Sequence, residues 1–511
     1  MKKLLLAVFS IATTFSLYAQ REVPQERMEQ IYEEVKTPYK YGLAVAPADN
    51  YHKIDCPTVF RQGDKWLMTY VVYNGKGGTD GRGYETWIAE SDNLLEWRTL
   101  GRVLSYRDGK WDCNQRGGFP ALPDMEWGGS YELQTYKGRH WMTYIGGEGT
   151  GYEAVKAPLY VGLAWTKGDI STAHEWESLD KPILSIHDKD AQWWEKLTQY
   201  KSTVYWDKDK TLGAPFVMYY NAGGHHPETN LKGERVGIAL SKDMKTWKRY
   251  SGNPVFAHEA DGTITGDAHI QKMGDVYVMF YFSAFEPSRK YKAFNTFAAS
   301  YDLVNWTDWK GADLIIPSKN YDELFAHKSY VVKHDGVVYH FYCAVNNAEQ
   351  RGIAIATSKP MGRSVVRFPK PEIKNRRQII ELNEGWKTWR VENGKLRVES
   401  EKTVNIPHNW DDYYGYRQLT HGNLHGTVLY KKDFILNNSQ FSTLNSQLKK
   451  YFLRFDGVGT YATITVNGKD FGRHPIGRTT LTLDVTDELK QGVNRLEVKA
   501  EHPEMIADMP W

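Results

Sequence analysis

A hairpin pattern that recurs five times limits the folds open to this chain more than any other feature of its sequence. Each copy has an apolar strand, a tight turn and a second strand rich in aromatic residues and Met; the copies lie at residues 59–70, 133–144, 204–220, 270–281 and 331–342. Turn residues such as Gly274-Asp275 and Asp335-Gly336 suit tight hairpins. A repeat of this size cannot bury its apolar face alone, so the copies must pack against one another.

The spacing of the repeats predicts their architecture. A further strand follows each hairpin, as in residues 236–247 and 297–306. The matching aromatic residues lie 75, 75, 61 and 62 residues apart; they are Trp66, Trp141, Phe216, Tyr277 and Tyr339. Each repeat is long enough for one four-stranded sheet with its loops, whereas solenoid repeats are shorter. Five sheets that close radially form a β-propeller, which we predict for residues 40–365.

The pattern changes after the propeller. Residues 366–378 are basic and contain Pro, and we predict a linker there. Residues 379–511 alternate apolar and polar positions in the manner of an antiparallel sandwich, with Asn467-Gly468 as a strong hairpin turn. The predicted fold class is therefore all-β, a five-bladed β-propeller followed by a β-sandwich.

The N-terminus has the pattern of a secretory signal peptide. Lys2-Lys3 precede an apolar stretch at residues 4–17, and Leu17-Tyr18-Ala19 forms a small-residue cleavage site. We expect residues 1–19 to be removed and the protein to be exported. No later segment is long and apolar enough to span a membrane. The three cysteines do not form a disulfide framework, which favours a bacterial periplasm, or secretion, as the location.

Composition narrows the classes of partner. Lys and Arg total 65 against 62 for Asp and Glu, a net charge of +3, so nothing favours binding to nucleic acid or an anionic membrane. The chain has 18 Trp, 33 Tyr and 19 Phe. Aromatic residues are typical of strands, and their flat faces also suit stacking on sugar rings. We expect an oligosaccharide or polysaccharide as partner; the sequence does not indicate an oligomeric state.

The repeats resemble the five-bladed glycosidases of glycoside hydrolase families 43, 32 and 117, because the pattern Ala-x-Ser-x-Asp-Leu-x-x-Trp recurs over about two thirds of the chain. Residues 406–410, 457–469 and 484–489 resemble the sugar-binding-like sandwich of family 2 glycosidases, a jelly roll of the galactose-binding kind. A catalytic barrel normally follows that sandwich. The sequence ends at Trp511, so we expect no barrel and an incomplete sandwich.

The first resemblance implies a catalytic base. Propeller glycosidases use carboxylates at the axial starts of their innermost strands, and Asp55-Cys-Pro resembles the family 43 signature that carries the base. We predict Asp55 as general base. Inverting hydrolysis places the acid about 6.5–9.5 Å away, which a different blade can supply.

The identity of the acid stays open. Asp267 lies within one residue of the Asp55 register, and His269 follows it; family 43 has a Glu at such a position and family 117 a His. Either Asp267 or His269 is the predicted acid, with Glu323 as a further candidate just outside the register. A His with a pKa near neutrality suits proton donation.

Further polar residues are predicted to bind substrate. Lys201 stands where families 43 and 32 place an Asp that tunes the acid, and Lys328 suits a substrate carboxylate or sulfate. His327 falls on the Asp55 register, where the family 43 resemblance implies a structural calcium ion in the channel; a buried, hydrogen-bonded His is the alternative. We predict no required cofactor. The loops of blade two add three residues suited to grip hydroxyls: Asp112, Arg116 and Glu148.

The sequence as a whole predicts an exported glycoside hydrolase that cleaves O-glycosidic bonds, exo-acting and inverting. A deep funnel with long insertions favours a pocket over an open cleft. A glycoside phosphorylase on the same fold is an alternative, with Lys201, Lys328 and Arg116 as its phosphate site. A non-catalytic glycan-binding protein is a third hypothesis, because the blade-three acid is missing.

Overall fold

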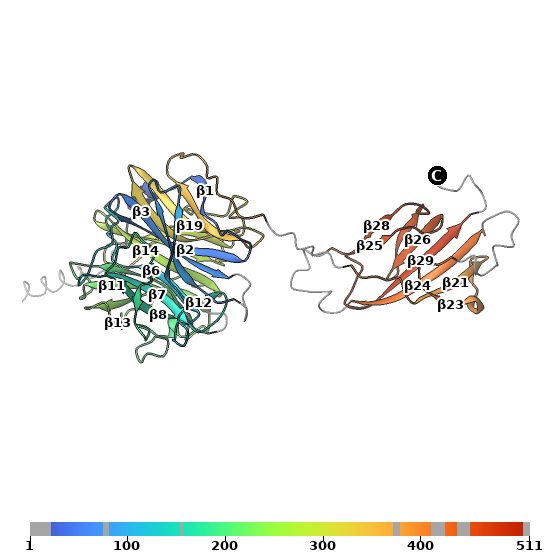
Figure 1. The fold of residues 1–511 in the computed structure, drawn as a ribbon, viewed down its shortest axis with the longest axis horizontal. Coiled ribbons are helices and arrows are strands. Elements are labelled where there is room, and N and C mark those ends of the chain that lie inside the picture. The colour runs from blue at the N-terminus through green and yellow to red at the C-terminus, as the bar shows by residue number, and fades with distance from the viewer. Residues whose placement is uncertain are drawn as a thin grey trace, which may run out of the picture. The chain divides into compact units, whose positions relative to one another are not determined.

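The computed structural model divides the chain into two compact units, residues 1–372 and 373–511 (Figure 1). It describes residues 22–74, 81–153, 157–370, 379–409, 425–436 and 450–503. The predicted signal peptide lies outside the described residues. The unit boundary falls within the predicted linker at residues 366–378. Each unit is described by itself.

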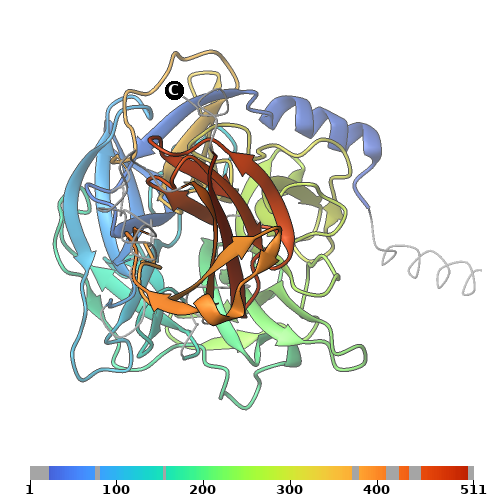
Figure 2. The same ribbon diagram turned by 90° about the vertical axis from the view of Figure 1, so that its right-hand side faces the viewer.

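Residues 1–372 form a five-bladed propeller, as predicted, and Figure 2 shows its sheets standing around a common centre. Blades one and two contain β2 (His52–Gln62), β3 (Lys65–Asn74), β4 (Glu85–Ser91), β5 (Arg98–Leu104), β6 (Gln115–Pro120), β7 (His140–Gly147), β8 (Tyr160–Thr166) and β9 (Glu177–Ser178). Blades three and four contain β10 (Thr198–Trp206), β11 (Phe216–His225), β12 (Lys232–Ser241), β13 (Trp247–Arg249), β14 (Thr263–Met273), β15 (Val276–Ala284), β16 (Ala293–Ser300) and β17 (Thr307–Asp308). Blade five contains β18 (Phe325–His334), β19 (Val337–Val345), β20 (Arg351–Thr357) and β1 (Tyr39–Val45).

The N-terminal strand closes the ring. β1 pairs antiparallel with β20, with Tyr39 opposite Thr357, so blade five is built from both ends of the propeller. The helix α2 (Gln25–Val35) precedes β1 and buries Met28, Ile31 and Val35 in the same apolar cluster as strands of blades four and five. The repeat pattern did not predict this helix, because it lies outside the repeated units.

Blade two corrects one sequence-based assignment. The repeat pattern predicts residues 133–136 as its inner strand, but the structure gives that place to β6, which pairs with β7. β6 contains Gly117 and Gly118, which disguised it as a loop. A Cβ on Gly118 would lie 2.4 Å from Met142 Sδ, so the crowded packing at this strand selects glycine.

The inner strands carry β-bulges at one shared level. The ladder shifts between Asp55 and Thr58 in β2, and the same shift occurs in β10, β14 and β18. Cys56, Asp267 and Lys328 follow the bulge with φ angles of 53°, 58° and 61°. A left-handed residue other than glycine costs about 1–2 kcal/mol. Such strain gathers at functional sites, and here it turns side chains of different blades toward one cavity.

Residues 373–511 form the predicted sandwich. One sheet contains β21 (Trp386–Glu392), β22 (Lys395–Leu396), β23 (Lys402–Val404), β24 (Gly426–Leu436), β26 (Tyr461–Val466), β27 (Lys469–His474) and β29 (Gly492–His502), while β25 (Phe452–Phe455) pairs with β28 (Leu481–Asp484). Asn467 and Gly468 form the turn between β26 and β27, with φ angles of 49° and 90°. In the described part of the chain, no helix is long and apolar enough to cross a membrane.

Candidate active site

A cavity of 180 Å³ lies where the inner strands of the propeller converge. All five blades contribute to its wall. The residues that line it are Cys56, Phe119, Ile145, Tyr152, Glu153, Tyr200, Lys201, Asn221, Glu234, Ile264, Asp267, Phe282, Ala284, Phe285, Phe325, His327, Lys328 and Arg351.

Glu153 presents a carboxyl group to the cavity. Lys328 Nζ donates to Glu153 Oε1 at 3.0 Å, and the hydroxyl of buried Tyr84 donates to the same oxygen at 2.9 Å. Within the described part of the chain, no donor reaches Oε2. One oxygen of Glu153 is therefore fixed, and the other is oriented to meet a water molecule or a sugar.

Asp55 lies behind Lys328 and not on the cavity wall. Its Oδ2 accepts hydrogen bonds from Lys328 Nζ at 2.9 Å and from Arg351 at 2.8 Å, and its Oδ1 accepts the Cys56 N–H at 2.9 Å. Burial alone would raise the pKa of Asp55, but Lys328 and Arg351 together hold it below its usual value. A fully buried carboxylate bonded in this way is a poor proton acceptor. The geometry instead makes Asp55 the counter-ion of two cations.

Glu234 has the opposite electrostatic environment. It sits on β12, where this strand runs parallel to the start of β14, and Asn221 Nδ2 donates to its Oε2 at 3.1 Å. Burial, reinforced by the negative charge of Glu153, raises the pKa of Glu234 to about 8. Glu234 is therefore protonated at neutral pH and can donate that proton.

Lys201 and Asp267 form a buried pair on the cavity wall. Lys201 Nζ lies 3.4 Å from Asp267 Oδ2, and neither atom has a hydrogen-bond partner among the described residues. Burial raises the pKa of Asp267, and Lys201 offsets only part of that effect. Unpartnered polar atoms on a cavity wall are free to bond a ligand.

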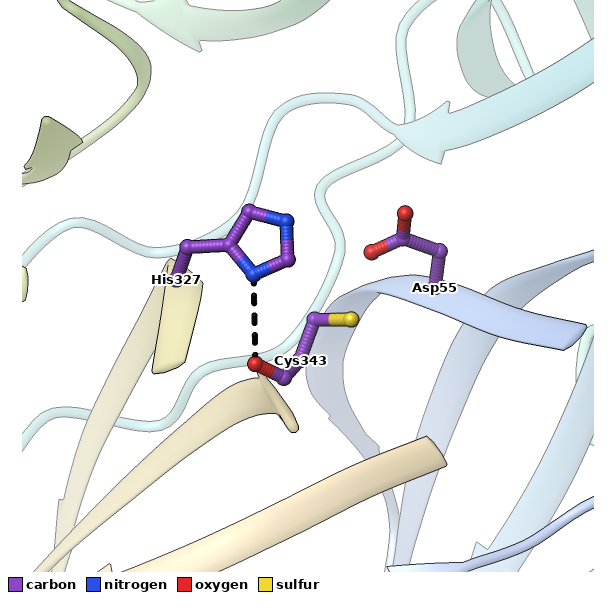
Figure 3. Close-up of side chains that lie close together, drawn as sticks. All are labelled: Asp55, His327 and Cys343. Carbon is purple, nitrogen blue, oxygen red and sulfur yellow. Dashed lines mark hydrogen bonds between the residues drawn. The ribbon is translucent and has the colours of Figure 1, made fainter. Parts of the chain in front are cut away.

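Asp55, His327 and Cys343 cluster within 4.8 Å of one another (Figure 3). His327 Nδ1 is 3.3 Å from the Cys343 carbonyl, and burial lowers the pKa of His327 to about 3. Calcium needs six to eight oxygen ligands. One nitrogen, one sulfur and a carboxylate already bonded to two cations do not fit calcium, so no step of the reaction is assigned to that ion.

The structure brings four of the predicted site residues to the cavity wall, namely Lys201, Asp267, His327 and Lys328. His269 is buried away from it and stacks on Tyr330 with centroids 3.8 Å apart. Burial holds the pKa of His269 well below its usual value. Glu323 is exposed and accepts the Asn347 N–H at 3.2 Å. His269 and Glu323 are thus not placed where an acid is needed.

The predicted blade-two residues also lie off the cavity wall. Asp112 and Arg116 form a buried ion pair of 3.2 Å, which Arg107 and Glu175 extend. Glu148 is exposed. Hydrogen bonds and ion pairs within blade two account for Asp112 and Arg116.

Inspection of the inner strands missed Glu153, Glu234, Tyr152 and Arg351. Glu153 lies in the loop after β7, and Glu234 and Arg351 lie on third strands of their blades. The one available signal is the charged sequence Lys232-Gly-Glu-Arg235, which begins a strand that is otherwise apolar.

The chain is similar to proteins of known class. A solved structure described as "Glycoside hydrolase" is 96% identical, with a TM-score of 0.68; the match covers 69% of this chain and 100% of the solved one. The chain belongs to the glycoside hydrolases. A second solved structure, with the same identity, coverage and TM-score, is described as a complex of BT0996 and RGII. The predicted glycosidase class is confirmed.

A family model matches the sandwich. Residues 411–508 match the glycosyl hydrolase 2 galactose-binding domain-like family, which confirms the predicted resemblance. A "Beta-glucuronidase" of Bacteroides fragilis is 30% identical over 138 residues, 26% of this chain and 18% of that protein. A "Putative beta-glucuronidase" of Formosa agariphila is 28% identical over 142 residues, 26% of this chain and 16% of that protein. The chain thus spans less than a fifth of the length of these curated relatives.

Proposed function

We propose that the propeller of this glycoside hydrolase is an exo-acting glycosidase in which Glu234 is the general acid and Glu153 the general base. The observation that carries the proposal is the pKa of Glu234, raised to about 8 in a cavity that also holds the Glu153 carboxyl. Pairs of carboxyl groups in contrasting environments are typical of acid and base roles in glycosidases.

The proposed reaction is a single displacement. Glu234 gives its proton to the glycosidic oxygen as the bond from that oxygen to the anomeric carbon breaks. Glu153 takes a proton from water, whose oxygen bonds to the anomeric carbon. Lys328 and Tyr84 hold Glu153 in place through Oε1. The products are a free sugar and the shortened glycan, and solvent restores the two protonation states.

Several features support the finer parts of the proposal. A cavity of 180 Å³ is smaller than the range of about 300–1,000 Å³ for clefts that take drug-sized ligands, which favours one terminal sugar ring. The signal-peptide pattern at residues 1–19 supports export to the periplasm or beyond. The similar structure described as a complex with RGII makes that carbohydrate the substrate to test. The inverting course also stays a proposal.

Asp267 is a second candidate for the acid, because burial raises its pKa too. The contact with Lys201 makes it the weaker donor of the two, since a neighbouring cation favours the ionised form. The phosphorylase alternative loses one of its three basic residues, because Arg116 does not line the cavity. The β-glucuronidase names belong to proteins that this chain covers only in small part, and we do not assign their activity to the propeller.

The test is hydrolysis of RGII by the wild type and by Glu234→Gln, Glu153→Gln and Asp267→Asn, with the released sugar identified by chromatography. We expect Glu234→Gln to lower kcat about 10²–10⁴-fold on the natural glycan. An aryl glycoside of the released sugar needs little acid assistance and should largely restore the rate of that variant. Restoration in Asp267→Asn alone would move the acid role to Asp267. The anomer that forms first, followed by NMR, decides between inversion and retention.

A further inference from the structure

Phe285 is the one exposed residue among those that line the cavity. Half of its surface, 50%, is accessible to solvent, whereas the other lining residues are buried or half-buried. It directly follows Ala284, the last residue of β15. Phe285 therefore stands at the mouth of the cavity, where the remainder of a glycan would leave the site.

The backbone at Phe285 is strained. Its φ angle is 58°, and its N–H donates to the Lys292 carbonyl at 2.8 Å to begin the loop between β15 and β16. Glycine adopts this conformation without cost, whereas a bulky residue with positive φ is an outlier. A half-exposed ring returns little burial energy. Local stability therefore does not explain why Phe occupies this position.

Phe325 supports the exposed ring from the neighbouring blade. The two ring centroids are 6.1 Å apart at 81°, an edge-to-face contact, and Phe325 also packs against His327 with centroids 5.5 Å apart. Both phenylalanines line the cavity. The contact orients Phe285 and leaves much of its surface in solvent, as a binding platform requires.

We propose that Phe285, supported by Phe325, is the binding platform for the leaving-group sugar, the ring on the far side of the bond that is cut. The proposal rests on the proposed function. The inner wall carries the charged and polar groups that suit the terminal ring, such as Glu153, Glu234 and Lys328. The mouth offers an apolar ring face instead, which suits the C–H face of a sugar. The platform makes this enzyme selective for a glycan over a simple glycoside.

The experiment compares Phe285→Gly, Phe285→Ala and Phe285→Trp with the wild type on two substrates, RGII and the methyl glycoside of the sugar released from it. We expect Phe285→Gly and Phe285→Ala to lower kcat/KM for RGII about 3- to 10-fold, the worth of one aromatic stacking contact. Rates on the methyl glycoside should stay within about twofold, since this substrate lacks a leaving-group ring. Phe285→Trp should retain activity on the glycan.

Stability separates this role from a structural one. Phe285→Gly should melt at the wild-type temperature or above it, because glycine relieves the strain at positive φ. Phe452 is the matched control, since it is 53% exposed and lies in the sandwich. Phe452→Ala should change neither rate.

Binding keeps the platform distinct from the proposed function. Calorimetry of RGII with Glu234→Gln, with and without Phe285→Gly, measures the platform without turnover. Equal affinities would overturn the platform, whatever the catalytic rates. A wild type that binds RGII but does not cleave it would overturn the proposed function, while weaker binding by the double variant would still support the platform.

Discussion

At the residue scale, Asp55 holds the site together through two cations. Lys328 bonds both Asp55 and Glu153, while Arg351 bonds both Asp55 and the hydroxyl of Tyr152, at 2.8 Å and 3.0 Å. One buried carboxylate thus fixes two side chains that reach the cavity. This makes Asp55 a positioning residue that acts through its partners, in place of the general base that its sequence motif suggested.

Asp55→Asn should destabilise the fold and slow the reaction together. Removing one partner of a buried ion pair costs about 3–5 kcal/mol, because the remaining charges lose their compensation. Chemical denaturation measures the stability, and kcat on RGII measures the positioning. Asp92→Asn is the control, since its bond to Lys65 lies on the surface and should contribute less than about 1 kcal/mol. Wild-type stability with complete loss of activity would instead restore Asp55 to the role of base.

Glu234 predicts the alkaline limb of the pH profile. A general acid with a pKa of about 8 loses its proton above that pH, so kcat/KM should fall tenfold per pH unit there. An alkaline limb that persists unchanged in Glu234→Gln, or one centred far from pH 8, would contradict the assignment.

The same group predicts a pH dependence of stability. The pKa of Glu234 is raised from 4.5 to about 8 in the fold, so between these values the folded state keeps a proton that the unfolded state releases. Stability from this group is full below pH 4.5 and is lost as the pH rises to about 8. Glu234→Gln should therefore gain stability relative to the wild type across this window, as thermal melts at pH 5 and pH 8 would show. A constant difference between the two proteins would contradict the shift.

The sequence predicted part of the site for a physical reason. Lys201, Asp267, His327 and Lys328 lie at the bulge of an inner strand, and the repeat register reveals that level. Glu153 lies in a loop, whose path depends on packing between blades rather than on the repeat. Residue type alone also does not show that cations neutralise Asp55 while burial protonates Glu234.

At the element scale, ring closure depends on a glycine in β1. Gly42 has a φ of 127°, and a Cβ there would lie 2.9 Å from Ser364 Cβ. Gly42→Ala should cost about 1–3 kcal/mol from strain and overpacking, measured by denaturant unfolding of the propeller. Gly262→Ala is the control, because its φ of 76° carries the strain while no atom lies within 4 Å. A smaller loss for Gly42→Ala than for Gly262→Ala would argue against tight packing at the closure.

The repeat also set the limit of prediction for the elements. The strands of blades one, three, four and five follow the expected hairpins, because alternating apolar residues and turn residues agree there. β6 was missed because its glycines answer contacts from other strands, with Gly117 3.0 Å from Ile145 and Gly118 2.4 Å from Met142, measured from an added Cβ. Contacts of this kind are set by the assembled ring and leave no local pattern.

At the scale of the whole molecule, the catalytic cavity belongs to one unit. Every residue that lines it falls between Cys56 and Arg351, inside the unit that ends at residue 372. Residues 22–372 alone should therefore fold and cleave RGII with a kcat/KM within about twofold of the full chain, because an independent domain keeps its own core. Loss of activity in the shortened protein would show that the sandwich contributes to the site.

A protein that begins at residue 47 provides the contrasting case. It lacks α2 and β1, so β20 loses its antiparallel partner and the cluster around Met28, Ile31 and Val35 loses its helix. An unpaired strand edge beside exposed apolar surface favours aggregation. We expect this protein to elute as aggregates in size-exclusion chromatography, whereas residues 22–372 elute as a defined species. A folded, active protein without β1 would mean that the ring does not need its N-terminal strand to close.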